Sequence, residues 1–147
     1  MPSIEDLKAR AVAEIDARGE QLIRTAKTIL DNPEPGFREE KTSRLVQSIF
    51  SEWGIEHESG IAITGVKGGL TGGSAGPTLA VMGELDSLRV IGHPHADPEN
   101  SAAHACGHHC QIGMMLGVAA GLQAEGVMEG LSGTVSLIAV PAEEYIE

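Results

Sequence analysis

The sequence has few aromatic and few basic residues, and each shortage excludes a class of protein. Aromatic residues make up 3% of the 147 residues, so aliphatic side chains and alanines must fill the core. Ten Lys and Arg residues stand against 21 Asp and Glu residues, which gives a net charge of −11. This balance argues against nucleic acid, whose phosphates require a basic surface, and it is compatible with binding cations.

Long apolar stretches and a disulfide framework are also missing. The apolar runs are too short to cross a bilayer, and the amino terminus has no signal-peptide pattern. The two cysteines, Cys106 and Cys110, lie four residues apart inside a histidine cluster, which is more typical of intracellular thiols than of a disulfide pair. We therefore expect a cytoplasmic protein without membrane contact, with a chain length suited to one domain.

The hydrophobic pattern predicts an α/β fold in which helices flank a mixed β-sheet. Helices are expected at residues 3–31, 39–53 and 106–124, and strands at 61–67, 78–85 and 134–140. Ser3, with Asp6 three residues later, suits a capping box at the start of the first helix. The short glycine-rich link between the first two strands predicts antiparallel neighbours. The last helix and strand predict a crossover into the interior of the sheet.

Metal ligands are concentrated in the stretch His104-Ala105-Cys106-Gly107-His108-His109-Cys110. Cys106 and His108 cannot share a face of a regular helix, but they can converge where a loop leads into a helix, and Gly107 permits the backbone that this requires. A helix amino terminus would lower the pKa of the thiol and favour the thiolate. Sulfur with imidazole suits zinc or a similar ion. A buried structural cysteine with capping histidines is the alternative.

Three carboxylates stand at or just beyond the ends of predicted strands. Glu143 and Glu144 follow the strand at 134–140, and open α/β sheets usually bind ligands at that end. Adjacent side chains in extended chain point in opposite directions, so one carboxylate can bind metal while the other takes a proton from the attacking water. Asp86, after the strand at 78–85, could orient a ligand imidazole. A solvated acidic turn and a turn aspartate are the alternatives.

Four stretches together resemble a known enzyme family. They are Asn32-Pro33-Glu34-Pro35-Gly36-Phe37, Gly83-Glu84-Leu85-Asp86-Ser87-Leu88, His104-Ala105-Cys106-Gly107-His108 and Pro141-Ala142-Glu143-Glu144. In this order they are similar to stretches of the aminoacylase and carboxypeptidase G type metallopeptidases. The most similar branch contains hippurate hydrolase, indole-acetyl-amino-acid hydrolases and aminobenzoyl-glutamate hydrolases.

The resemblance implies a zinc-exopeptidase-like catalytic domain that hydrolyses small amides such as N-acyl amino acids. It also implies two divalent ions, of zinc, manganese or cobalt. Cys106 would bridge them, His108 and Glu144 would be further ligands, and Glu143 would be the general base. Asp86, from its place at the strand end, is the second predicted catalytic residue and would orient a ligand.

The sequence departs from this family in three respects. His109-Cys110-Gln111 stands where the branch often has Asp-Gly-His, which leaves the substrate open, and Glu84 stands where other branches carry a metal-binding histidine. Similar enzymes take further histidine ligands from beyond the paired glutamates and insert a lid domain for dimerisation. We therefore expect residues 1–147 to be the truncated amino-terminal part of one catalytic domain, inactive alone, with a homodimer formed by the complete enzyme. A non-catalytic metal-binding module of the same fold is the alternative.

Overall fold

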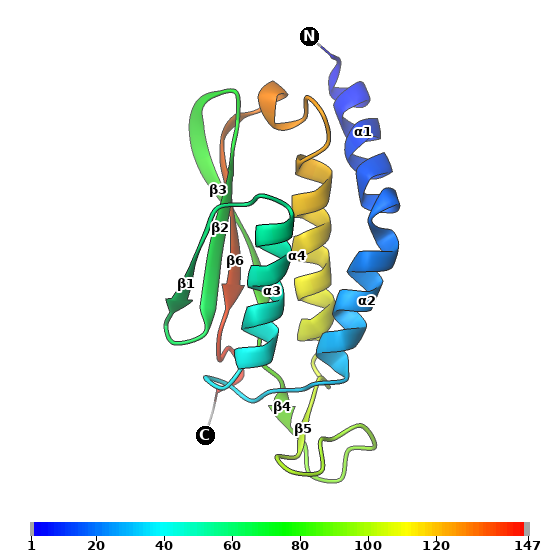
Figure 1. Ribbon diagram of the computed structural model, residues 1–147, viewed down its shortest axis with the longest axis vertical. Coiled ribbons are helices and arrows are strands. Elements are labelled where there is room, and N and C mark those ends of the chain that lie inside the picture. The colour runs from blue at the N-terminus through cyan, green and yellow to red at the C-terminus, as the bar shows by residue number, and fades with distance from the viewer. Residues whose placement is uncertain (1, 146–147) are drawn as a thin grey trace.

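The computed structural model describes residues 2–145, and its centre is a four-stranded sheet with helices packed on one face (Figure 1). The elements are α1 (Ile4–Ala17), α2 (Gly19–Leu30), α3 (Glu40–Glu52), β1 (His57–Ile61), β2 (Gly65–Thr71), β3 (Ser74–Glu84), β4 (Leu88–Arg89), β5 (Ala102–Ala103), α4 (His108–Leu122), the 3-10 helix η1 (Met128–Gly130) and β6 (Ser132–Val140). The sheet contains both parallel and antiparallel pairs. The predicted α/β class with a mixed sheet and flanking helices is confirmed.

The strand order differs from the prediction in one respect. The order is β1-β2-β6-β3, with β6 antiparallel to β2 and parallel to β3. The predicted strands at 61–67 and 78–85 are therefore not neighbours, because β6 lies between their counterparts β2 and β3. The short glycine-rich link does not determine the pairing, because the backbone of β6 pairs with both β2 and β3. The sequence pattern also missed β1, which forms a hairpin with β2.

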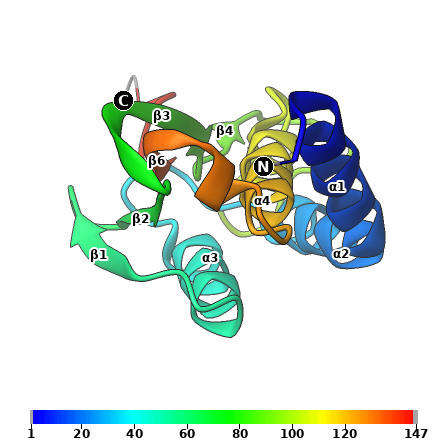
Figure 2. The same ribbon diagram turned by 90° about the horizontal axis from the view of Figure 1, so that it is seen from above.

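The long helix predicted at residues 3–31 is two helices. Arg18 has φ −94° and ψ 4°, which ends α1, and α2 begins at Gly19. The capping box of Ser3 and Asp6 is present at the start of α1, as predicted. Both helices pack on α4, which lies between them and the sheet (Figures 1 and 2). The break at Arg18 also brings its guanidinium 4.5 Å from the ring centre of Trp53.

Helix α4 provides the predicted crossover between β3 and β6. It begins at His108, two residues later than expected, after Gly107 with φ 107°. Its residues Ile112, Met115 and Leu116 are buried in the main core, as the apolar sequence predicted. This crossover places the start of α4 beside the carboxyl ends of the parallel strands β3 and β6, where the candidate site lies.

The apolar strand predicted at 134–140 does not form an edge of the sheet. Its counterpart β6 is paired on both sides, as predicted for a strand in the interior of the sheet. The edges are β1 and β3, and Leu79 and Met82 of β3 are about two-thirds exposed. The segment of residues 87–103, between β3 and α4, contains the short pair β4 and β5. Within residues 2–145 the structure has no helix long and apolar enough to span a membrane.

Candidate metal centre

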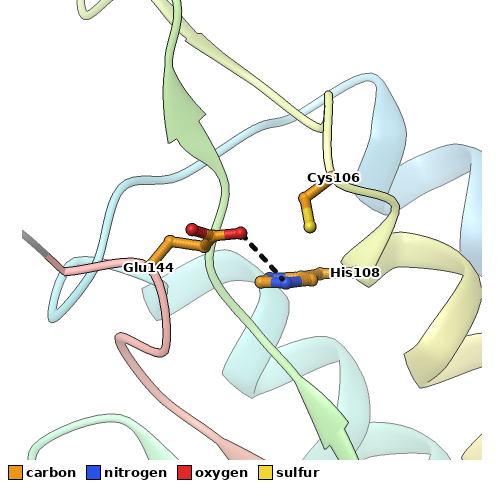
Figure 3. Close-up of side chains that lie close together, drawn as sticks. All are labelled: Cys106, His108 and Glu144. Atoms are coloured by element: carbon orange, nitrogen blue, oxygen red, sulfur yellow. Dashed lines mark ion pairs between the residues drawn. The ribbon is translucent and has the colours of Figure 1, made fainter.

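The predicted ligands converge at the carboxyl ends of β3 and β6. Cys106 lies in the loop before α4, His108 is the first residue of α4, and Glu144 lies in the turn after β6 (Figure 3). One ligand atom from each of these three residues lies within 4.8 Å of the others. Two segments that are remote in the sequence thus bring sulfur, imidazole and carboxylate together, a donor set that suits zinc or a similar borderline ion.

Asp86 orients His108 and also contacts the turn after β6. His108 is buried, and its Nδ1 lies 3.1 Å from Asp86 Oδ1 and 2.9 Å from the Asp86 backbone oxygen. The other carboxylate oxygen of Asp86 accepts a hydrogen bond of 2.8 Å from the backbone N–H of Glu144. One buried carboxylate therefore contacts both halves of the site. This is the usual arrangement behind a metal-binding imidazole, whose second nitrogen donates to a carboxylate or carbonyl.

The Nε2 atom of His108 faces three carboxylates. It lies 2.8 Å from Glu84, 3.7 Å from Glu143 and 3.8 Å from Glu144. Glu84, His108 and Glu143 form a second group whose ligand atoms lie within 4.8 Å of one another. When Nδ1 donates to Asp86, the Nε2 lone pair points at this negative cluster, and a bound cation would balance the charge. The residues present therefore fit a divalent metal ion.

Cys106 differs from the expectation in its pKa. A hydrogen bond to Glu144 is the main reason why the pKa of the Cys106 thiol is raised above its usual range, and the charges of Glu144, Glu143 and Glu84 add to the effect. The expected lowering of the pKa by a helix terminus is therefore outweighed by the neighbouring carboxylates. The neighbouring carboxylates thus favour the thiol over the thiolate, and a bound cation would reverse that preference.

The remaining histidines of the cluster lie beside the site but outside both ligand groups. His104 is buried, and neither of its ring nitrogens has a hydrogen-bond partner among residues 2–145. Burial lowers its pKa to about 4, and the charges of His109 and His108 contribute. Burial likewise lowers the pKa of His109, whose ring centre lies 5.3 Å from that of His104. His93 and His95 contact each other in the loop between β4 and β5.

Two residues near the site were given no role by the sequence analysis. Glu39 accepts a hydrogen bond from the backbone N–H of Ala142, immediately before the paired glutamates. Glu84 forms the shortest of the contacts with His108 Nε2, although its position relative to a metal was open from the sequence. The resemblance marked the position of Glu84, where other branches carry a metal-binding histidine, but it left open whether Glu84 contacts a metal. Glu39 could not be identified from the sequence, because only the fold brings it into contact with the turn after β6.

The chain is similar in sequence to hydrolases and peptidases, although no protein-family model matches it. IAA-amino acid hydrolase ILR1-like 6 of Arabidopsis thaliana is 38% identical over 127 residues, which cover 84% of this chain and 26% of that protein. Thermostable carboxypeptidase 2 of Saccharolobus solfataricus is 35% identical over 150 residues, which cover 98% of this chain and 36% of that protein. The chain thus spans 26% and 36% of the lengths of these two relatives.

The fold is similar to that of a solved metallopeptidase. A dinuclear metal binding peptidase of the M20 family from Bacillus subtilis superposes with a TM-score of 0.76 at 29% identity, over 88% of this chain and 37% of that chain. The sequence and fold comparisons agree on one class of protein, the hydrolases and peptidases, and the solved peptidase is a dinuclear metal-binding one. The chain is related to the aminoacylase and carboxypeptidase G type metallopeptidases, as its motifs predicted, and it corresponds to part of their length.

Proposed function

We propose that this chain carries the metal-binding half of an amide hydrolase whose substrates are N-acyl amino acids or related small amides. The observation that carries the proposal is the convergence of Cys106, His108 and Glu144, with Glu143 adjacent, at one end of the sheet. The relatives named as an IAA-amino acid hydrolase and a carboxypeptidase support this class of substrate. We also propose that residues 1–147 form part of one catalytic domain.

In this proposal each site residue has a separate task. Cys106, His108 and Glu144 would hold divalent cations, of zinc, manganese or cobalt, and a bound cation would supply Lewis acidity for amide hydrolysis. Glu143 accepts the proton of the attacking water and returns it to the leaving nitrogen. Its side chain is 49% exposed, as a group that must meet water and substrate requires. Asp86 holds the His108 ring with its Nδ1 directed away from the ligands.

The test uses the full-length protein, because the chain spans about a third of its relatives. The protein is loaded separately with zinc, manganese and cobalt and assayed on a panel of N-acyl amino acids, with Glu143→Gln as the matched control. We expect hydrolysis by the wild type and loss of turnover in the control. Metal binding by the wild type without hydrolysis of any amide in the panel would instead support the non-catalytic alternative.

A further inference from the structure

The turn that carries the paired glutamates is fixed by a second buried carboxylate besides Asp86. Glu39 is fully buried, and its Oε1 accepts a hydrogen bond of 2.7 Å from the backbone N–H of Ala142. Its Oε2 accepts a hydrogen bond of 2.6 Å from the hydroxyl of Thr64. Burying a carboxylate is costly unless it is hydrogen-bonded, and here both oxygens have partners. The carboxylate therefore links the start of α3 to the turn after β6.

Glu39 is in a position where its side chain would usually serve the helix instead. It is the N-cap residue of α3, yet its side chain does not accept a hydrogen bond from the first turn of the helix. An N-cap side chain normally does so. In this protein the carboxylate of Glu34 takes over that task, because it accepts from the backbone N–H groups of Lys41 and Thr42. The Glu39 carboxylate is thereby available for Ala142.

The backbone that Glu39 contacts is in an unfavourable conformation. Ala142 has φ 54°, in the left-handed region that non-glycine residues rarely adopt. Such a conformation persists where the surrounding structure determines it, and a hydrogen bond to a carboxylate is a strong constraint. The segment that contains Glu39 also packs against the turn at Gly36, because a Cβ atom added to Gly36 would lie 3.0 Å from the Cβ of Ala142. The direction in which the chain leaves Ala142 is thus set by Gly36 and Glu39.

We propose that Glu39 is a positioning residue for Glu143, a role that rests on the proposed function of Glu143 as general base. By holding the N–H of Ala142, Glu39 fixes the backbone from which the Glu143 side chain departs. Asp86 fixes Glu144 separately, by accepting a hydrogen bond from the backbone N–H of Glu144. Loss of Glu39 should therefore affect proton transfer more than metal binding. A misplacement of about 1 Å in a reacting group can cost about 100-fold in rate.

The experiment compares three variants of the full-length, zinc-loaded protein. Glu39→Ala removes the acceptor for Ala142, whereas in Glu39→Gln the amide oxygen can still accept from Ala142 and the amide nitrogen can donate to Thr64. Glu34→Ala is the matched control, because it removes a buried carboxylate of the same segment. That carboxylate accepts hydrogen bonds from α3 and not from the turn. The measurements are kcat and KM on an N-acyl amino acid, zinc content, and hydrogen exchange of the Ala142 and Glu143 amides.

For Glu39→Ala we expect kcat to fall about 10- to 100-fold. KM and zinc content should stay unchanged, and exchange at Ala142 should be faster. Glu39→Gln should have a kcat close to that of the wild type. Glu34→Ala should lower thermal stability while keeping kcat. Should Glu39→Ala fail to fold, Glu39→Asp replaces it, because its carboxylate is one methylene too short to keep the contact. Equal kcat and equal Ala142 exchange in the Glu39 and Glu34 variants would overturn the positioning role.

Failure of the proposed function gives a different result. A wild type that hydrolyses no amide in the panel overturns the proposed function and with it the role of Glu39 in catalysis. Faster Ala142 exchange in Glu39→Ala but not in Glu34→Ala would then still show that Glu39 holds the turn. The two failures are therefore distinguishable.

Discussion

The segment that leads into α4 and the turn that follows β6 meet at the same site, but they are held in different ways. His108 is almost fully buried and is oriented through its ring, by the Asp86 hydrogen bond. The side chains of Glu143 and Glu144 are 49% and 25% exposed. Their turn is held through its backbone, by Asp86 and Glu39. The His108 imidazole is thus held by a hydrogen bond to the side chain itself. The turn that carries Glu143 and Glu144 is instead held by hydrogen bonds to its backbone.

The largest effect is expected at the exposed carboxylate. Glu143→Gln keeps the shape and the hydrogen bonding of the side chain but cannot accept the proton of the water, so kcat should fall about 10²- to 10⁴-fold. Because the backbone holds the turn, the fold and the metal content should not change. Steady-state kinetics and metal analysis of the full-length protein measure both quantities.

Glu144→Gln is the control for this experiment, and it should lower metal affinity instead. The opposite pattern, with metal lost in the Glu143 variant and kept in the Glu144 variant, would exchange the two roles. The contact of Glu143 with His108 at 3.7 Å makes this a real alternative, since Glu84, His108 and Glu143 also form a ligand group.

The next largest effect is expected for the thiol. Cys106→Ser should lower zinc affinity by more than about 100-fold, because a direct ligand should matter more than the surrounding residues that typically contribute 10- to 100-fold. Cys110→Ser is the matched control, since Cys110 is exposed and contacts His109 rather than a ligand of either group. Zinc retained after dialysis is the measurement. Equal retention by Cys106→Ser and wild type would remove Cys106 from the ligand set.

A smaller effect on metal affinity is expected at Asp86, whose carboxylate contacts both His108 and the backbone of Glu144. Asp86→Asn supplies one acceptor oxygen where His108 and Glu144 use two, so one donor would face the amide nitrogen. Zinc affinity should fall about 10- to 100-fold, the usual range for a residue behind a ligand histidine. Competition with a chelator measures the change. An unchanged affinity would mean that burial alone orients His108.

The smallest effect, on stability, is expected at Gly36, which packs against the turn after β6. Gly36→Ala places a methyl group 3.0 Å from the Cβ of Ala142 and 3.2 Å from Tyr145, so the turn must shift slightly. The free energy of unfolding should fall by about 1 kcal/mol, at the low end of the cost of overpacking. Gly19→Ala is the control, because it meets no atom within 4 Å. Chemical denaturation compares the two variants, and equal stabilities would show that the turn accommodates the methyl group freely.

The local features of the chain were largely predictable from its sequence. The capping box at Ser3, the helix near residues 39–53 and the interior strand near 134–140 follow from side-chain chemistry and periodicity within a few residues. The convergence of Cys106, His108 and Glu144 was expected because their segments stand at strand ends and at the start of a helix. The break at Arg18 was missed because apolar spacing continues across it.

The sequence by itself determined the kinds of donor atom, because these follow from residue identity. It also determined their places at the end of a strand or at the start of a helix, because these follow from neighbouring residues. Tertiary structure alone decided the strand order, the contact of Glu84 with His108 and the reversed pKa shift of Cys106. The hydrogen bond from Ala142 to Glu39 joins residues 103 positions apart. Such contacts depend on how the loops at one end of the sheet pack together, and no local pattern records that packing.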